Sequence, residues 1–364
     1  MKLKTLINIL VVSGVAVFAY NLYSEYKTAS EQIAINDSYN SGNYNETVER
    51  IIILAEQGSR REQFNLGTLY QDGKGVIQNS TKAFYWYKKA AEQELSQAQY
   101  NLGNMYESGT GTPKDSKKAV YWYKKAAGQG LANAQSDLGI MYANGDGISR
   151  DSKKAVYWYK KAAEQGYTNA QHNLGVVYQN GIGTPKNNKK SVYWYKKAAG
   201  QGFAKSQYNL GVMYVDGLGV EKDSKKAAYW YKQAANQGLS FSQHSLGVMY
   251  QHGIGITQDY TKAFKWYMKA AKQGHVKAQF NIGMMYSQGH GIEKNHKKAF
   301  EWHKKAAEQG YVTSQVALGV LYHSGKGIKK DDKKAFKWVK KAAEQGNPNA
   351  QLLLSDLYQT GSGV

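Results

Sequence analysis

The sequence predicts an all-α solenoid that is built from 36-residue helix-loop-helix repeats. Three observations carry this prediction. Leu-Gly pairs, with one Ile-Gly, recur every 36 residues from Leu66-Gly67 to Leu318-Gly319 without an insertion. Glycine occupies four columns of this repeat, which together hold 34 of the 38 glycines. All eight tryptophans fall in one further column, from Trp86 to Trp338, so one unit has been copied along the chain.

The first half of each unit has the pattern of an amphipathic helix. Ala98, Leu102, Met105 and Tyr106 are spaced at i, i+4, i+7 and i+8, which places them on one helix face. Gly109 follows at the point where a helix commonly ends in a left-handed residue. The pattern therefore predicts a first helix that ends before Gly109, followed by a short Gly-x-Gly connection.

The second half of each unit predicts a second helix with a defined start. An Asn or Asp always precedes its expected first turn, and the side-chain oxygen of either residue can accept an otherwise unpaired backbone N–H. These residues are Asn79, Asp115, Asp151, Asn187, Asp223, Asp259, Asn295 and Asp331. Ala119, Trp122, Tyr123 and Ala126 should then face inward, and Gly130 should end the helix.

The N-terminus is expected to direct the chain out of the cytoplasm. Lys2 and Lys4 precede an apolar run over residues 6–18, which is typical of a secretory signal cleaved after Ala19 or of an uncleaved membrane anchor. No polar stretch follows Ala19, and the tyrosines that do follow favour a membrane interface. We expect residues 1–23 to remain as an anchor at the inner membrane with the repeats facing the periplasm. If the segment is cleaved, the protein is periplasmic or secreted.

The remaining chain divides into two expected segments. Residues 24–58 have the pattern of a degenerate N-terminal capping repeat, in which Arg50 replaces the tryptophan. Terminal repeats are atypical because their outer face meets water instead of a neighbour. Residues 59–364 should form the solenoid proper, with eight full units and a terminal first helix.

Composition and charge exclude several classes of function. The chain has no cysteine, which excludes disulfides, thiolate metal sites and a cysteine nucleophile. The formal net charge of +21 favours acidic partners. The basic residues are nearly all lysine, whereas readers of bases and phosphates prefer the planar arginine fork. We therefore expect no nucleic-acid partner.

No motif predicts catalysis, a cofactor or a metal. Each Gly-x-Gly follows a helix, whereas a dinucleotide-binding loop follows a strand. The single Ser-x-x-Lys, from Ser24 to Lys27, lies outside the repeats and lacks the companion motifs of a serine β-lactamase. His244 and His252 are eight residues apart on one helix, hence about 12 Å apart, which is too far to share one ion.

The repeated pattern resembles a known family. Ala-Gln-x-x-Leu-Gly-x-x-Tyr-x-x-Gly-x-Gly, followed by Lys-Ala-x-x-Trp-Tyr-x-Lys-Ala-Ala-x-Gln-Gly, is similar to the Sel-1-like repeat, a relative of the tetratricopeptide repeat, over about residues 62–364. The resemblance implies a right-handed superhelix whose first helices line the concave side. It also implies protein–protein interaction without catalysis, often at bacterial envelopes. Some members carry cysteines and are described as binding or hydrolysing β-lactams.

In the geometry that the resemblance implies, two columns of the first helices face the concave groove. We call them the groove columns. The expected partner-binding residues are Phe64, Tyr100, His172, Tyr208, His244 and Phe280 in the first column, and Val176, Val212, Val248 and Met284 in the second. Rings and aliphatic side chains with few charges suit a bound peptide. The alternative is that this face packs on the neighbouring first helix.

These expectations lead to one main hypothesis and two alternatives. The main hypothesis is a non-enzymatic scaffold at the bacterial cell envelope that binds a protein or peptide in the groove. The first alternative, from family analogy only, is a cell-wall or β-lactam hydrolase. The second is an anionic-surface binder, because lysine pairs such as Lys117 with Lys118 and Lys124 with Lys125 recur on the second helices. Its partner would be an anionic membrane or cell-wall surface.

Overall fold

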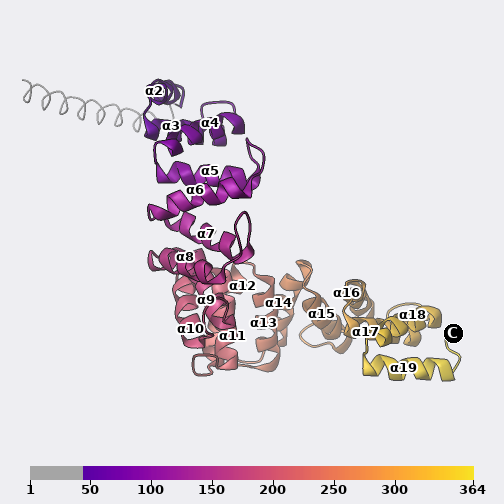
Figure 1. The fold of residues 1–364 in the computed structure, drawn as a ribbon. Helices are drawn as coiled ribbons and strands as arrows, with labels where there is room; N and C mark the ends of the chain where they lie inside the picture. Colours follow the sequence, from indigo (N-terminus) through magenta and orange to yellow (C-terminus); the bar gives the residue numbers. More distant parts are fainter. Residues whose placement is uncertain (1–43) are drawn as a thin grey trace, which may run out of the picture. The chain divides into compact units, whose positions relative to one another are not determined.

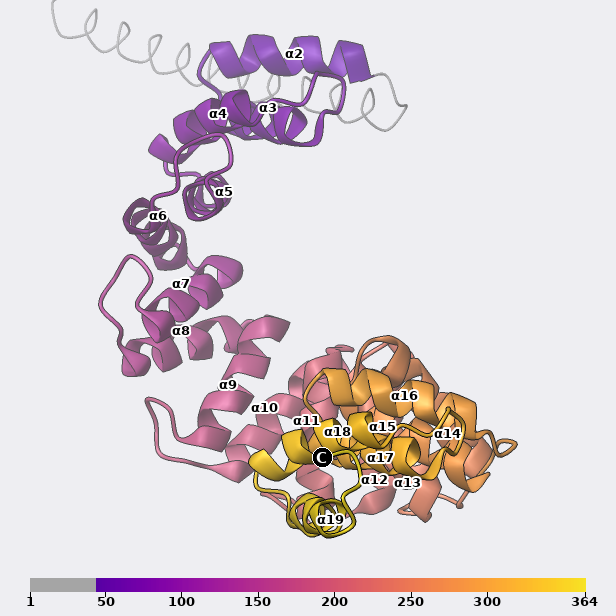
Figure 2. The same cartoon turned by 90° about the vertical axis from the view of Figure 1, so that its right-hand side faces the viewer.

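The structure is a computed structural model that describes residues 44–364 (Figure 1; Figure 2 shows the same ribbon turned by 90°). Within these residues the chain forms eighteen α-helices and no strand, which confirms the all-α prediction. The predicted anchor or signal at residues 1–23, the Ser24 to Lys27 motif and the start of the predicted capping repeat lie outside the described residues.

The described residues divide into two compact units, residues 44–165 and 166–364, which are described separately. The helices of the first unit are α2 (Tyr44–Glu56), α3 (Arg60–Asp72), α4 (Ser80–Glu92), α5 (Ser96–Ser108), α6 (Ser116–Gly128), α7 (Ala132–Asn144) and α8 (Ser152–Glu164). Those of the second unit are α9 (Thr168–Asn180), α10 (Asn188–Gly200), α11 (Ala204–Asp216), α12 (Ser224–Asn236), α13 (Ser240–His252), α14 (Tyr260–Lys272), α15 (Val276–Gln288), α16 (His296–Glu308), α17 (Val312–Ser324), α18 (Asp332–Glu344) and α19 (Pro348–Gln359).

Within each unit, consecutive helices pack on one another as in a repeat solenoid. In the first unit α3 packs on α4, α4 on α5, and so on to α8, while α2 packs on α3. In the second unit the same succession runs from α9 to α19. Each helix therefore contacts mainly its neighbours in sequence, which is the contact pattern of repeat proteins.

The ends of the helices follow the predicted chemistry. All eight Asn and Asp residues named above are N-caps, and each side chain accepts a hydrogen bond from the backbone N–H three residues later. For Asn187 the acceptor oxygen lies 2.9 Å from the nitrogen of Lys190. The first helices end at left-handed glycines, such as Gly109 with a φ of 78°. Caps thus fix the same boundaries in every repeat.

The core explains why glycine follows each leucine. A Cβ added to Gly103 would lie 2.6 Å from the ring of Tyr123, which is completely buried. The sequence prediction that tryptophan and tyrosine both face inward is therefore only partly correct. The tyrosine of each pair is the core residue, and Trp122 is half-buried beside it. Adjacent helix positions differ by about 100°, so only one of the two rings can face the glycine.

A ladder of glutamines links the helices within each repeat and joins each repeat to the preceding one. Gln99 is almost completely buried, and its amide donates to the backbone oxygen of Ala91 at 3.2 Å. Its side-chain oxygen accepts from Gln129 Nε2 at 2.8 Å. The same glutamine pair, 30 residues apart, recurs in both units, for example between Gln207 and Gln237. Because buried polar atoms are costly when unpaired, the bond from each buried glutamine to the alanine oxygen eight residues earlier fixes the register of each repeat on the preceding one.

Candidate functional site

The rings of the first groove column are half-buried between packing and solvent. Each ring contacts an aromatic side chain on the second helix of its own repeat, with centroids 5.6 to 5.8 Å apart. Several also reach the next repeat, as where Tyr208 lies 6.1 Å from Phe241. The face thus packs partly on neighbouring helices and remains partly accessible, and all six ringed residues of the column share this environment.

The second groove column is more closely tied to the core. Val176, Val212, Val248 and Met284 are all half-buried. Val176 and Val212 pack against the buried cluster of α10 to α13, and Val248 packs against the cluster of α14 to α16. These side chains can contribute apolar surface to a binding face, but a large part of each is already used in packing.

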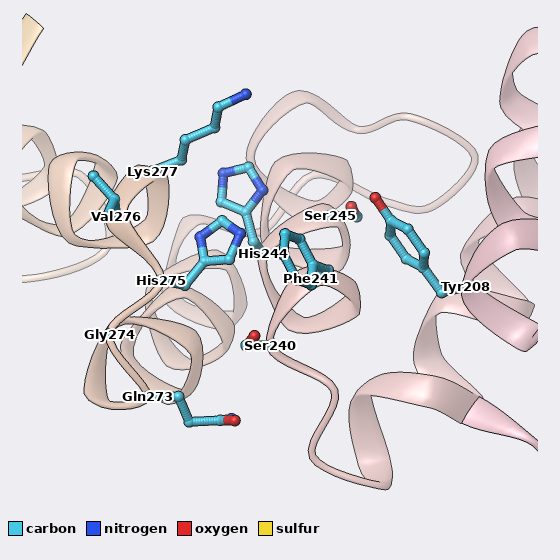
Figure 3. Close-up of a pocket in the computed structure, with 10 residues that line it drawn as sticks. All are labelled: Tyr208, Ser240, Phe241, His244, Ser245, Gln273, Gly274, His275, Val276 and Lys277. Carbon is cyan, nitrogen blue, oxygen red and sulfur yellow. The ribbon is translucent and has the colours of Figure 1, made fainter. Parts of the chain in front are cut away.

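Two of the predicted residues meet in one open pocket of the second unit. Tyr208 and His244 line a pocket of about 730 Å³ together with Phe241 and His275 (Figure 3). The remaining lining residues are Ser240, Ser245, Gln273, Gly274, Val276 and Lys277. The other predicted groove residues do not line this pocket. Of these, Phe64 and Tyr100 belong to the first unit.

Sequence reasoning missed two of the rings that build this pocket. Phe241 has Arg61, Gln97, Asn133, Asn169, Lys205, Lys277, Thr313 and Asn349 as its repeat equivalents, and none of these is aromatic. His275 is the only histidine in its column, in which Leu, Tyr and Phe dominate. The signal that could have found them was departure from the repeat. At Phe241 a column that is otherwise polar becomes aromatic, and at His275 a mostly apolar column becomes polar, next to a histidine in the groove column.

The pocket rings form a continuous cluster. The His244 and His275 rings are stacked, with centroids 4.7 Å apart and planes 23° apart. Phe241 meets His275 edge-on at 5.2 Å and remains 55% exposed. Burial, together with nearby His275 and Lys277, lowers the pKa of His244 to about 4. Burial also lowers the pKa of His275. Both rings are therefore neutral at pH 7.

Beside Tyr100 of the first groove column, the first unit carries a different, acidic cluster. Tyr100 donates a hydrogen bond from its hydroxyl to Asp137 Oδ2 at 2.9 Å, and Tyr123 donates to Glu107 Oε2 at 2.5 Å. Burial, with the charge of Glu107, raises the pKa of Asp137 to about 6. Burial and Glu107 also raise the pKa of Tyr123. This unit therefore offers hydrogen-bond acceptors where the second unit offers histidines.

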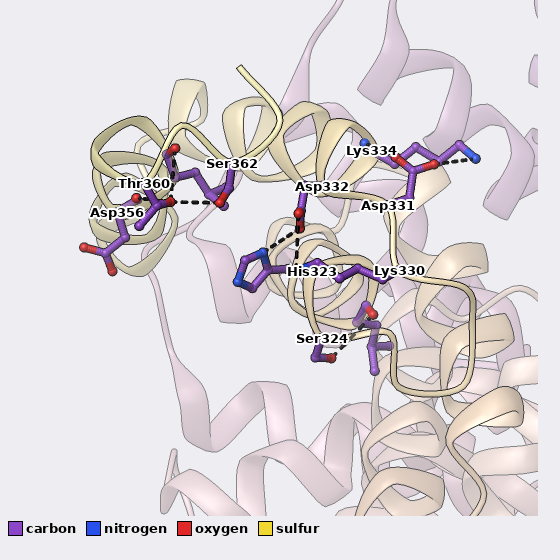
Figure 4. A network of polar contacts seen from close by, with 11 residues as sticks. His323, Ser324, Lys330, Asp331, Asp332, Lys334, Asp356, Thr360 and Ser362 are labelled. Carbon is purple, nitrogen blue, oxygen red and sulfur yellow. Dashed lines mark hydrogen bonds and ion pairs between the residues drawn. The ribbon is translucent and has the colours of Figure 1, made fainter.

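The Gly-x-Gly loops and His323 have structural roles. The second glycine of a Gly-x-Gly loop lies against the preceding second helix, where a Cβ on Gly111 would collide with the backbone oxygen of Ser80. His323 binds Asp332 at 2.8 Å in a polar network at the start of α18, which Lys330 also joins (Figure 4). Among the described residues, no three metal-ligating side chains converge on one point.

The lysines of the second helices are exposed, but many have partners. Lys118 lies 3.4 Å from the capping carboxylate of Asp115 and 5.3 Å from the ring of Tyr106. Lys125 lies 5.3 Å from the ring of Tyr121, and that tyrosine is itself half-exposed. Similar contacts recur in later repeats. These lysines give the second helices a basic surface and also shield their exposed rings.

Comparison with known proteins decides the family. The Sel1 repeat matches residues 63–95, 96–131, 132–167, 168–203, 204–239, 240–275, 276–311, 312–347 and 348–364. The chain belongs to the Sel1-repeat family. Sel1-repeat proteins are generally non-enzymatic scaffolds that bind other proteins. No curated protein matches the chain.

Two solved structures of Sel1-repeat type are similar over most of this chain. A protective antigen of uropathogenic Escherichia coli strains is 35% identical, with a TM-score of 0.60, and the match covers 87% of this chain and 83% of that one. A Sel1 repeat protein of Oxalobacter formigenes is 34% identical, with a TM-score of 0.66, covering 85% and 90% respectively. Within residues 44–364 of this chain, no helix has the length and apolar character that a membrane span requires.

Proposed function

We propose that this protein is a non-enzymatic scaffold at the bacterial cell envelope that binds a protein or peptide along its groove columns. The observation that carries this proposal is the pocket of Tyr208, Phe241, His244 and His275. Four half-buried or exposed rings gather there on or next to packed helices, and such rings lose little conformational entropy when a partner binds.

The location at the envelope is supported by the sequence of residues 1–23. Lys2 and Lys4 ahead of an apolar run favour export with the N-terminus inside. The similar Escherichia coli protein is described as a protective antigen, which supports an exported location. Intact mass or N-terminal sequencing of the protein from its native envelope tests the anchor. A chain that begins at Tyr20 would instead show a cleaved signal and a soluble exported protein.

Partner capture tests the scaffold function. The exported region should recover a protein partner after cross-linking in the native envelope. Replacing Tyr208, His244 and Phe280 together by Ala should abolish this capture, because the binding rings are lost while the helices remain. A matched triple variant of Tyr157, Tyr193 and Tyr229, which are exposed on the second helices, should still capture the partner. Equal capture by both variants would place the site elsewhere.

A second function rests on the exposed lysines of the second helices. In the same envelope setting, this basic surface would attract an anionic lipid or cell-wall polymer. Such binding should weaken steeply as salt rises, because long-range attraction between exposed charges is screened. Binding to anionic vesicles that stays constant between low and physiological salt would remove this function.

A further inference from the structure

The pocket of the second unit presents hydrogen-bond donors rather than acceptors. His275 Nδ1 accepts from the backbone N–H of Ala278 at 3.2 Å, so the neutral ring carries its proton on Nε2. The amide nitrogen of Asn281 can only donate, and it lies 3.3 Å from His244 Nε2. His244 therefore carries its proton on Nδ1. Each ring keeps one N–H donor that these contacts do not use.

The charges around the pocket have one sign. Lys277 is the only ionised side chain among the lining residues, and Figure 3 shows it on the same side as the two histidine rings. The titratable groups that face His244 from the packed elements are Tyr267 of α14, His275 before α15 and Lys277 of α15. None of them is a carboxylate. Rings alone would also suit a cation, but this lysine and the histidine pair disfavour one.

The apolar part of the pocket is formed by Phe241 and Tyr208. Their ring centroids are 6.1 Å apart, and Phe241 is 55% exposed on the first turn of α13. Neither ring is stacked face to face with the other, since their planes are 48° apart. This leaves a ring surface on which a further planar side chain can pack edge-on or offset.

We propose that this pocket binds a peptide segment in which an acidic side chain stands next to an aromatic side chain. The carboxylate accepts from the histidine N–H groups and from the Lys277 ammonium, and the aromatic ring packs on Phe241 and Tyr208. A carboxylate is the side chain that only accepts hydrogen bonds when ionised, which matches a donor-rich site. This inference rests on the proposed scaffold function and specifies the chemistry of its partner.

The repeats themselves supply substitutions that keep the fold. His275→Phe introduces the residue found at Phe203 in the same column, where the helix starts without a side-chain cap. Phe241→Asn introduces the residue found at Asn169, and Lys277→Thr the one found at Thr313. Each variant therefore removes one part of the pocket while using a side chain that the solenoid already tolerates at that position.

Blocked peptides test the proposal directly. The probe is an acetylated and amidated Gly-Asp-Phe-Gly peptide, whose binding to the full chain is followed by calorimetry and by the NMR signals of the His244 and His275 rings. We expect binding that weakens about tenfold or more in each of the three variants, the cost of a lost charge-assisted hydrogen bond or ring contact. His252→Gln, which introduces the side chain found at Gln288 in the same column, changes an exposed histidine outside the groove columns, serves as the matched control and should bind normally.

The peptide series separates the alternatives. Exchange of Asp for Asn, or of Phe for Gly, should weaken binding about tenfold. Equal affinity for a Lys-Phe peptide, or unchanged affinity in His275→Phe, would overturn the proposal. Binding of an Asn-Phe peptide only when its C-terminus is free would instead assign the site to a chain end. If these peptides fail while the envelope partner is still captured in a Tyr208-dependent manner, the inference is wrong and the scaffold function stands.

Discussion

In six repeats a buried tyrosine ring occupies space that a preceding glycine leaves open by having no Cβ. Gly211 and Tyr231 form one such pair, in which an added Cβ would lie 2.6 Å from the ring. The ring cannot move away easily, because the surrounding interior is close-packed. Glycine is retained here for packing, although it lowers helix propensity.

Gly211→Ala should therefore destabilise the fold by about 1–3 kcal/mol, the usual cost of overpacking a core. Gly200→Ala is the matched control, because Gly200 is the last residue of α10 and a Cβ there meets no atom within 4 Å. The control should leave the free energy of unfolding unchanged or slightly higher. Urea unfolding of both variants measures the difference, and equal stability would refute the role of the close approach.

Asp137 is the acidic exception in a column that otherwise reads Asn65, Asn101, Asn173, Asn209, Ser245, Asn281, Ala317 and Leu353. Its pKa is raised to about 6, first by burial and then by Glu107. A raised carboxyl pKa means that the folded state holds the proton more tightly than the unfolded state. Its contribution to stability is therefore full below about pH 3.8 and is lost as pH rises through about 6.

Asp137→Asn should accordingly stabilise the protein by about 1–3 kcal/mol at pH 7 and by little at pH 4. Asparagine keeps an oxygen that can accept from the Tyr100 hydroxyl, so the packing should remain. Chemical unfolding at the two pH values measures the change. A variant that is less stable than the parent at pH 7 would show that the carboxylate is stabilising in the fold.

At the residue scale the candidate site was only half predictable. Tyr208 and His244 were found because they share a column with other rings. Phe241 and His275 were missed because the predicted residues were those that the repeats have in common, whereas these two residues depart from their repeat equivalents. The burial of tyrosine rather than tryptophan was also missed. The two are neighbours in sequence, and only the position of the glycine opposite them decides which ring is enclosed.

At the scale of a helix, the N-caps were fully predictable from sequence. A side-chain oxygen one residue before the first turn needs only the local backbone, so no tertiary information is required. Asn187→Ala should cost about 1 kcal/mol, because the N–H of Lys190 loses its 2.9 Å acceptor. Asn188→Ala, inside the same first turn, is the comparison. Thermal unfolding measures the melting temperatures of both variants. An equal decrease in the two would show that the capping hydrogen bond of Asn187 does not contribute to stability.

His303 places an imidazole where other second helices carry the core tyrosine. It is 2% exposed, and its Nδ1 has no hydrogen-bond partner among the described residues. Burial lowers its pKa to about 4. A lowered histidine pKa contributes stability that is present above the unfolded value of about 6.5 and is lost as pH falls toward 4.

His303→Tyr restores the side chain of the equivalent Tyr267 and should flatten the loss of stability between pH 6.5 and pH 4. It should also raise stability by about 1 kcal/mol or more, because an unpaired buried nitrogen is removed. His252→Gln, on an exposed residue, is the control and should leave the acid profile unchanged. Urea unfolding at several pH values in this range gives the free energy of unfolding of both variants. If stability falls as steeply with decreasing pH in His303→Tyr as in the parent, His303 is not the cause of the loss.

At the scale of the molecule, the repeat period predicted the architecture because the contacts that define each helix and join one repeat to the next recur with it. Caps, glycine columns and the glutamine ladder all recur at the same offsets, so local and long-range signals agree. The N-terminal segment and its role in location are different. They depend on a membrane and on a processing step, which no contact within residues 44–364 records.

Removal of one whole repeat tests whether the repeats are interchangeable units that join through the same contacts. Deleting residues 312–347 places Pro348 directly after Tyr311, so the remaining first helix should pack on the preceding repeat through the same contacts. The shortened chain should fold with lower stability, since stability in repeat proteins is roughly a sum over repeats and their interfaces. Deleting residues 312–346 shifts the phase by one residue and should unfold that end. Circular dichroism and urea unfolding separate the two, and similar behaviour would refute the register argument.

The glutamine ladder also bears on how such a chain can change over generations. The joints between repeats use the same bond at the same offset, from a buried glutamine amide to an alanine backbone oxygen eight residues earlier, so unequal recombination that gains or loses a whole unit leaves joints of unchanged chemistry. Natural selection can then adjust the number of units without first repairing an interface. Positions such as Phe241 and His275, which differ from their equivalents, mark units that such an exchange would not replace without loss of the pocket.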